Sequence, residues 1–184
     1  MSLPIPEPDF ALSCHACLVK RAFAVPPWPQ ATATSLDAFG LGEGAWAKAM
    51  SDEERLWILM FLPPKPEGGG VSVFLDPAGD GEAYFEINVG EDRRPIFRAA
   101  RRSRSGTKVD SRWNCDGFAE LMPPGGEKPD GGMGGGIGFS IPFASLGSIK
   151  PGEGWKVAFG QAGTAFRPPR LWVPLHFSIE SPGK

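Results

Sequence analysis

The stretch 71–90, VSVFLDPAGDGEAYFEINVG, constrains the fold of this chain more strongly than any other segment. It holds two runs rich in apolar, β-branched and aromatic residues, 71–75 and 84–89. Between them stands Asp-Pro-Ala-Gly-Asp-Gly, whose residues favour turns and disfavour a helix. The pattern therefore predicts a β-hairpin.

The second arm of this hairpin predicts two unlike faces. Apolar side chains recur at every second position from Phe85 to Val89, and the positions between them hold Glu86 and Asn88. Because successive side chains of a strand point to opposite faces, one face suits a hydrophobic core and the other presents hydrogen-bonding groups. We expect the polar face to be open and to be a natural place for a binding site.

The rest of the chain predicts further strands joined by many turns. Gly 25 and Pro 20 together approach a quarter of the 184 residues, which is high for a helical protein, and this length suits one domain. We expect residues 1–12 to form an extended tail and residues 13–184 to form a single domain. The apolar run 56–62, which two prolines end, predicts a central strand buried on both faces. Further strands are predicted at 14–25, 137–142, 155–160 and 175–179, with one helical turn at 143–147. The fold class is therefore all-β, an antiparallel β-sandwich of the jelly-roll or immunoglobulin-like kind.

The order of several short motifs resembles a known family. FLDP, GDG and YFEINVG are followed by a Trp-containing segment, by GFSIPFASLG, by PGEGWKVAFG and by a late Trp. In this order, from about Trp28 to about Ile179, they resemble the family 9 carbohydrate-binding modules and their wider DOMON-like β-sandwich relatives. The resemblance implies a non-catalytic module that binds a mono- or oligosaccharide in a bacterial carbohydrate-utilisation setting. It also favours a periplasmic or secreted location, although no export signal is visible at the N-terminus.

The ligand contacts expected from the resemblance come from distant parts of the chain. Sugar binding needs flat aromatic faces for the apolar side of a pyranose ring and polar groups for its hydroxyls. Trp172 matches the C-terminal tryptophan of the family, and Glu86 and Asn88 match polar positions on the hairpin. Trp113 is a second candidate platform, and Arg98 is a further candidate ligand residue.

The sequence departs from the family pattern in three places. Residues 66–68, PEG, stand where well-known members carry a second clamping tryptophan. Residues 160–162, GQA, replace a frequent Arg or Asn, and residues 138–139, GF, replace the usual Glu. A structural or interaction domain that has lost the sugar site is therefore one alternative.

Two further alternatives concern bound metal. Asp76 and Asp80 bracket a glycine turn, and oxygen donors so close together can hold a structural Ca²⁺, although turn-stabilising aspartates show the same pattern. No other cofactor is expected. Some related sandwiches bind a b-type haem and transfer electrons, for which Met60, Met133 and His176 are available as axial ligands.

The sequence gives little support for catalytic activity or for binding to a charged partner. With two histidines and no nucleophile elbow, HExxH or catalytic-cysteine signature, we expect no enzyme. Cys14 and Cys17 favour idle or buried thiols over a redox pair or half of a zinc site. The net charge of −2 gives no global field for nucleic acid or an anionic membrane, and no apolar stretch is long enough to span a bilayer. The arginine-rich stretch 93–108 predicts an edge strand or loop, with docking of an acidic partner as the alternative.

Overall fold

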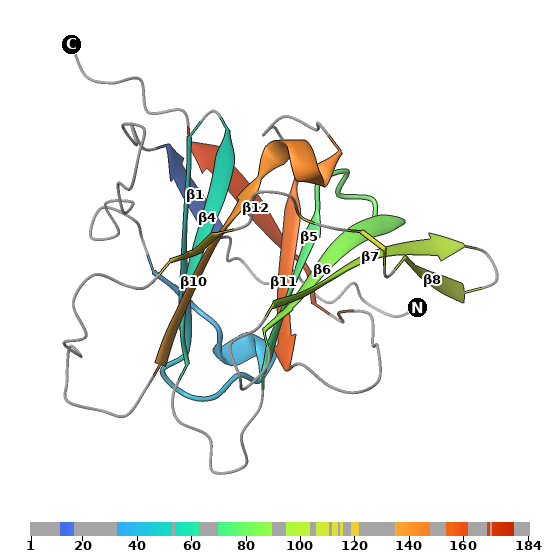
Figure 1. Ribbon diagram of the computed structural model, residues 1–184. Coiled ribbons are helices and arrows are strands. Elements are labelled where there is room, and N and C mark those ends of the chain that lie inside the picture. Colours follow the sequence, from blue (N-terminus) through green and yellow to red (C-terminus); the bar gives the residue numbers. More distant parts are fainter. Residues whose placement is uncertain are drawn as a thin grey trace, which may run out of the picture.

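The computed structural model of the chain describes residues 12–16, 33–52, 54–62, 70–89, 95–103, 106–110, 112–113, 115, 119–121, 135–147, 154–161, 169 and 171–178. These residues form strands and two single 3-10 turns, and they contain no longer helix (Figure 1). None of the described helices has the length and apolar character needed to cross a membrane. The expected all-β fold is confirmed.

Most of the strands are short. In chain order the elements are β1 (Leu12–Ala16), β2 (Thr34–Ser35), η2 (Asp37–Phe39), β3 (Trp46–Ser51), β4 (Arg55–Leu62), β5 (Val71–Asp76), β6 (Ala83–Val89), β7 (Pro95–Ser103), β8 (Gly106–Asp110), β9 (Ala119–Leu121), β10 (Gly135–Pro142), η3 (Phe143–Leu146), β11 (Lys156–Gln161) and β12 (Val173–Ser178).

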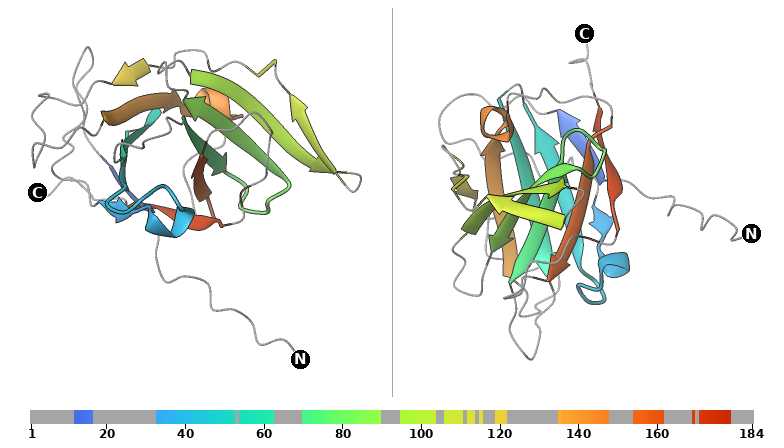
Figure 2. Two further views of the ribbon diagram at one scale, coloured as in Figure 1. Left: turned by 90° about the horizontal axis from the view of Figure 1, so that it is seen from below. Right: turned by 90° about the vertical axis from the view of Figure 1, so that its right-hand side faces the viewer.

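The strands form two sheets that face each other across the core (Figure 2). Their hydrogen-bonded order is β8-β7-β6-β5-β11-β12-β1-β3-β4-β10-β9, with β2 beside β3. We call β5 to β8, β11 and β12 the hairpin sheet, and β1 to β4, β9 and β10 the β4 sheet. The pairs are antiparallel as expected, except that β1 runs parallel to both β12 and β3 and so joins the two sheets.

The predicted hairpin is confirmed as β5 and β6, which pair antiparallel with Val71 opposite Val89 and Leu75 opposite Phe85. Asp76 organises the turn between them. Its Oδ1 accepts a hydrogen bond from the backbone N–H of Gly79 at 2.7 Å, and its Oδ2 accepts one from the N–H of Gly81 at 2.8 Å. The fully buried Asp76 therefore ties the turn to the end of β5.

The predicted central strand is confirmed as β4, which pairs with β3 on one side and β10 on the other. A tight turn precedes it, closed by a hydrogen bond from the backbone N–H of Asp52 to the carbonyl oxygen of Arg55. There the Oδ1 of Asp52 accepts hydrogen bonds from the N–H groups of Glu54 and Arg55, both at 2.7 Å. Leu56 to Met60 are buried on both faces of the strand.

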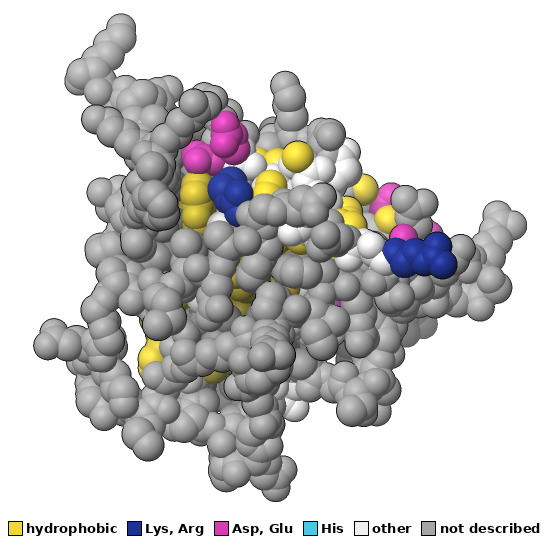
Figure 3. All heavy atoms as spheres, in the orientation of Figure 1, with side chains coloured by type: hydrophobic (Ala, Val, Ile, Leu, Met, Phe, Trp, Pro, Cys, Tyr) yellow, Lys and Arg dark blue, Asp and Glu magenta, His cyan; other side chains and the backbone are white. Residues whose placement is uncertain are grey.

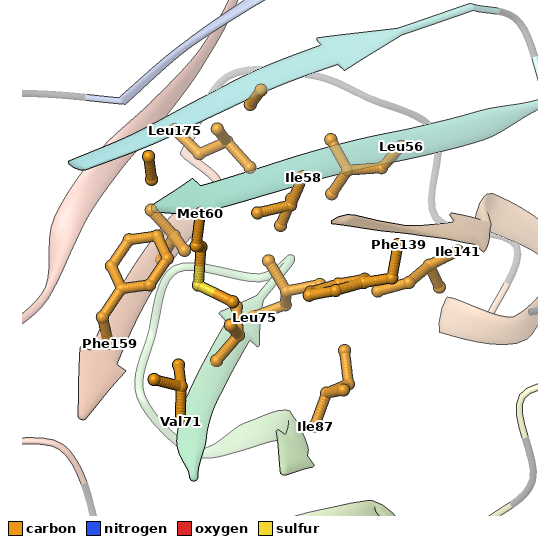
Figure 4. Close-up of a cluster of buried hydrophobic side chains, with 14 of the residues drawn as sticks. Leu56, Ile58, Met60, Val71, Leu75, Ile87, Phe139, Ile141, Phe159 and Leu175 are labelled. Atoms are coloured by element: carbon orange, nitrogen blue, oxygen red, sulfur yellow. The ribbon is translucent and has the colours of Figure 1, made fainter. Parts of the chain in front are cut away.

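The core lies between the sheets (Figure 4). Side chains from both sheets meet there, and the close-up shows Ile58 and Met60 of β4 facing the layer that holds Val71, Leu75 and Ile87. Phe139 and Ile141 of β10 close one side of this cluster. This packing buries the apolar face of the hairpin, which was the face that the sequence assigned to the core.

Three parts of the fold differ from expectation or extend it. β2, β3 and β9 were not predicted. In β3, Ala47 and Ala49 are weak strand formers, and the segment before them is rich in glycine. The first expected strand begins at Leu12, and residues 17–25 lie outside the described part. The described part of the arginine-rich stretch lies in β7 and β8, which pair antiparallel, with β8 at the edge of the sheet order as expected of an edge strand.

Candidate functional site

The outer face of the hairpin sheet holds most of the residues predicted to bind a ligand. Strand pairing aligns Ala158 with Phe74, Phe74 with Glu86, and Glu86 with Arg98. A neighbouring row aligns Gly160 with Ser72, Ser72 with Asn88, and Asn88 with Ile96. The backbone pairing therefore brings positions from β11, β5, β6 and β7 together in two adjacent rows.

Aromatic side chains form the centre of this face. Phe74, Tyr84 and Ala158 are buried together, and Trp172 packs against them from the residue before β12. The ring centroid of Trp172 lies 5.4 Å from that of Tyr84 at an interplanar angle of 68°, and 6.5 Å from that of Phe74 at 69°. These edge-to-face contacts fix the orientation of the indole, which stays partly exposed to solvent. We call Phe74, Tyr84 and Trp172 the aromatic cluster.

The polar groups beside the aromatic cluster are buried, which corrects the expectation of an open polar face. Glu86 is 4% exposed and Asn88 is 6% exposed. The hydroxyl of Ser72 donates a hydrogen bond to Oδ1 of Asn88 across the β5–β6 pair. The alternation in β6 reveals which side chains share a face, but it cannot reveal that Phe74 and Tyr84 crowd the same face and shield it.

The backbone position of Arg98 is beside the candidate site, on the strand next to β6. It is the Cα partner of Glu86 in the β6–β7 pairing. Its side chain lies outside the described part of the structure, so its predicted ligand contact stays a prediction. On the face drawn in Figure 3, the described charged side chains form small groups that mix acidic and basic members rather than one field.

Trp113 lies elsewhere, against the core. Its ring is 4.8 Å from that of Phe85, centroid to centroid, and its Nε1–H donates to the carbonyl oxygen of Ser145 at 3.0 Å. Phe85 belongs to the core face of β6, whereas Trp172 packs on the outer face. The structure thus separates the two tryptophans that the sequence proposed as platforms.

The aspartates proposed for Ca²⁺ both serve the β5–β6 turn. Asp76 accepts the two backbone hydrogen bonds described above, and Oδ1 of Asp80 accepts one from the N–H of Glu82 at 2.8 Å. Among the described residues, no three His, Cys, Asp or Glu side chains gather to hold a metal ion. The Ca²⁺ site at this turn stays a prediction.

Two of the residues proposed as haem ligands, Met60 and His176, do not share a site. Met60 is fully buried in the core, whereas His176 is exposed on β12, next to the core residue Leu175. Met133 lies outside the described residues. Cys14 is in β1 and Cys17 is outside the described part, while Cys115 is buried in the core.

Sequence reasoning missed several residues of the outer face. Ser72, Phe74 and Gly160 share it because they pair, directly or through one strand, with Asn88 and Glu86. The alternation of the first hairpin arm was a usable indication for Ser72 and Phe74. The position of Gly160 depends on pairing between strands far apart in the sequence, which the local pattern does not specify.

The fold is similar to that of known sugar-binding proteins. No family model matches the sequence, and no curated protein matches it. A family 9 carbohydrate-binding module from Caldicellulosiruptor kristjanssonii, solved in complex with glucose, superposes with a TM-score of 0.55 at 15% identity, covering 94% of this chain and 98% of that one. A family 9 module from the same organism in complex with cellotriose gives 0.53 at 14% identity, covering 93% and 95%. A candidate carbohydrate-binding protein from Bacteroides uniformis gives 0.57 at 12% identity, covering 91% and 99%. The expected likeness to family 9 modules is therefore confirmed at the level of the fold, along nearly the whole chain.

Proposed function

We propose that this chain is a non-catalytic saccharide-binding module whose main contact is Trp172. The observation that carries the proposal is the state of its indole, which is held by edge-to-face contacts with Phe74 and Tyr84 and remains partly exposed. A fixed and accessible aromatic surface suits the apolar face of a pyranose, because little conformational entropy is lost on binding. Solved structures of the same fold contain glucose and cellotriose, which makes these sugars the first ligands to test.

Glu86 and Asn88 take a second role in this proposal. They lie next to the aromatic cluster on the same face, and their side chains are of the kind that hydrogen-bond sugar hydroxyls, but burial makes them supports of the site rather than its exposed contacts. Because both are buried, their replacement is expected to affect folding as well as binding. Trp172 is therefore the residue whose loss reports most directly on ligand contact.

Isothermal titration with glucose and cellotriose tests the proposal. We expect Trp172→Ala to weaken binding at least tenfold, which corresponds to about 1.4 kcal/mol. Trp113→Phe is the matched control, because that ring packs on the core face and its change is expected to leave affinity unaltered. Absence of heat with these sugars and with a wider panel of mono- and disaccharides would refute the proposed function.

No observation favours the alternatives to the same degree. An electron-transfer role needs two axial ligands that face one haem, and Met60 and His176 lie on different faces. Docking of an acidic partner to residues 93–108 remains a proposal supported by composition and by the edge position of β8. Binding of an acidic protein whose affinity falls steeply between low and high salt would support that role instead.

A further inference from the structure

A second aromatic surface lies on the outer face of the β4 sheet. The β3–β4 pairing aligns Trp46 with Phe61, and their rings stack with centroids 5.6 Å apart and an interplanar angle of 11°. Both side chains are partly exposed. The adjacent residues Ala47 and Met60 are fully buried in the core, so the stacked pair lies on the opposite face. We call Trp46 and Phe61 the stacked pair.

The neighbouring strand adds no side chain beside this pair. In the β4–β10 pairing, Gly136 stands opposite Phe61 and Gly138 stands opposite Leu59. Because glycine has no side chain, β10 does not cover the side of Phe61 that is turned away from Trp46. At the other end, Nζ of Lys48 lies 5.6 Å from the centre of the Trp46 ring and brings hydrogen-bond donors to its rim.

The size of the exposed surface selects the kind of ligand. Met50, Trp57 and Leu59 share this face with the stacked pair, but they are buried, so among the described side chains of β3 and β4 the accessible apolar surface of this face is that of the pair. An aromatic side chain can bury about 150–250 Å², so two partly covered rings offer on the order of 100 Å². A stable protein interface needs roughly 800 Å² from each partner. The available area fits one sugar ring and is too small for a protein partner.

We propose that the stacked pair is a second saccharide contact that takes one pyranose ring of a β-glucan chain. The inference rests on the proposed function and extends it, because Trp172 and the stacked pair lie on different sheets. A short oligosaccharide that occupies one contact leaves the other empty. A long or immobilised polymer engages both contacts, and the second binding step gains from the high effective concentration.

Electrophoresis of the full chain in native gels that contain hydroxyethyl cellulose tests the polymer contact, and titration with cellotriose tests the short ligand. We expect Trp46→Ala and Phe61→Ala each to weaken retention by the polymer at least threefold. Trp172→Ala is expected to be retarded by the polymer less than the parent chain, but still measurably. The double variant Trp172→Ala, Trp46→Ala is expected to lose this remaining retention. Trp46→Phe keeps a flat ring over Phe61, and it is expected to keep most of the retention.

The outcomes separate this inference from the proposed function. If the parent chain is retarded and Trp46→Ala is retarded equally, the second contact is overturned and the Trp172 site stands. If the parent chain binds neither polymer nor oligosaccharide, both proposals fail. Circular dichroism checks that the alanine variants fold. If Trp46→Ala does not fold, the parent chain is studied by NMR instead. We expect the resonance of the Trp46 indole N–H to shift when the polymer is added, and an unmoved resonance overturns the inference. The Trp46→Phe spectrum assigns that resonance.

Discussion

The turn of the β5–β6 hairpin offers a sharp test of the structure, because two of its glycines share a backbone conformation and a hydrogen-bond partner but differ in the space beside them. Gly79 and Gly81 adopt left-handed backbone conformations with φ of 70° and 71°. Both N–H groups donate to the carboxylate of Asp76. A Cβ built on Gly81 meets nothing within 4 Å, whereas one built on Gly79 lies 2.0 Å from the carbonyl oxygen of Gly154.

The expected losses follow from these two observations. Gly81→Ala places a side chain in the left-handed region and is expected to cost about 1–2 kcal/mol in the free energy of unfolding. Gly79→Ala carries the same strain and also pushes against backbone that must move, which adds roughly 1–3 kcal/mol. For a chain of this size each kcal/mol lowers the melting temperature by about 2–4 °C.

Urea and thermal unfolding followed by tryptophan fluorescence measure the difference between the two variants. Gly79→Ala should melt below Gly81→Ala by roughly 2–12 °C, and its urea midpoint should fall while the slope stays constant. Equal destabilisation by the two changes would show that the β5–β6 turn does not contact the backbone at Gly154, and the reasoning would be wrong.

The other predictions concern single contacts. Asp76→Asn is expected to cost about 1.5–3 kcal/mol in urea unfolding, because an amide cannot accept hydrogen bonds through both of its polar atoms. Trp113→Phe loses the hydrogen bond to Ser145 and is expected to cost about 1 kcal/mol, and a cost near zero would contradict the contact. In a Cys14→Ser, Cys17→Ser variant the remaining thiol, Cys115, is expected to react with Ellman's reagent only as fast as the protein unfolds. Rapid labelling of the native variant would contradict its burial.

Local sequence patterns predict the elements that depend on local chemistry. The β5–β6 hairpin follows from its turn residues and from the alternation in each arm. The central strand β4 follows from its apolar run and the prolines after it. The core face of β6 is correctly assigned because Phe85 and Ile87 carry apolar side chains at alternate positions of the strand.

The candidate site depends on pairing that local patterns do not contain. Trp172 precedes β12 and Tyr84 lies in β6. The two rings come into contact because the sheet order brings β12 within three strands of β6, through β11 and β5. The same arrangement buries Glu86, whose polar character predicted an open face. The parallel pairing of β1 was equally invisible, because side-chain alternation does not distinguish parallel from antiparallel neighbours.

The position of β1 has a consequence for how the protein is made. Its pairing with β12 joins Leu12 to Leu175, so the seam between the two sheets is formed by strands from opposite ends of the described chain. During synthesis, β1 must wait for almost all later strands before it gains this partner. Contacts so distant along the chain slow folding, and a nascent chain that stops short of β12 exposes strand edges that favour aggregation.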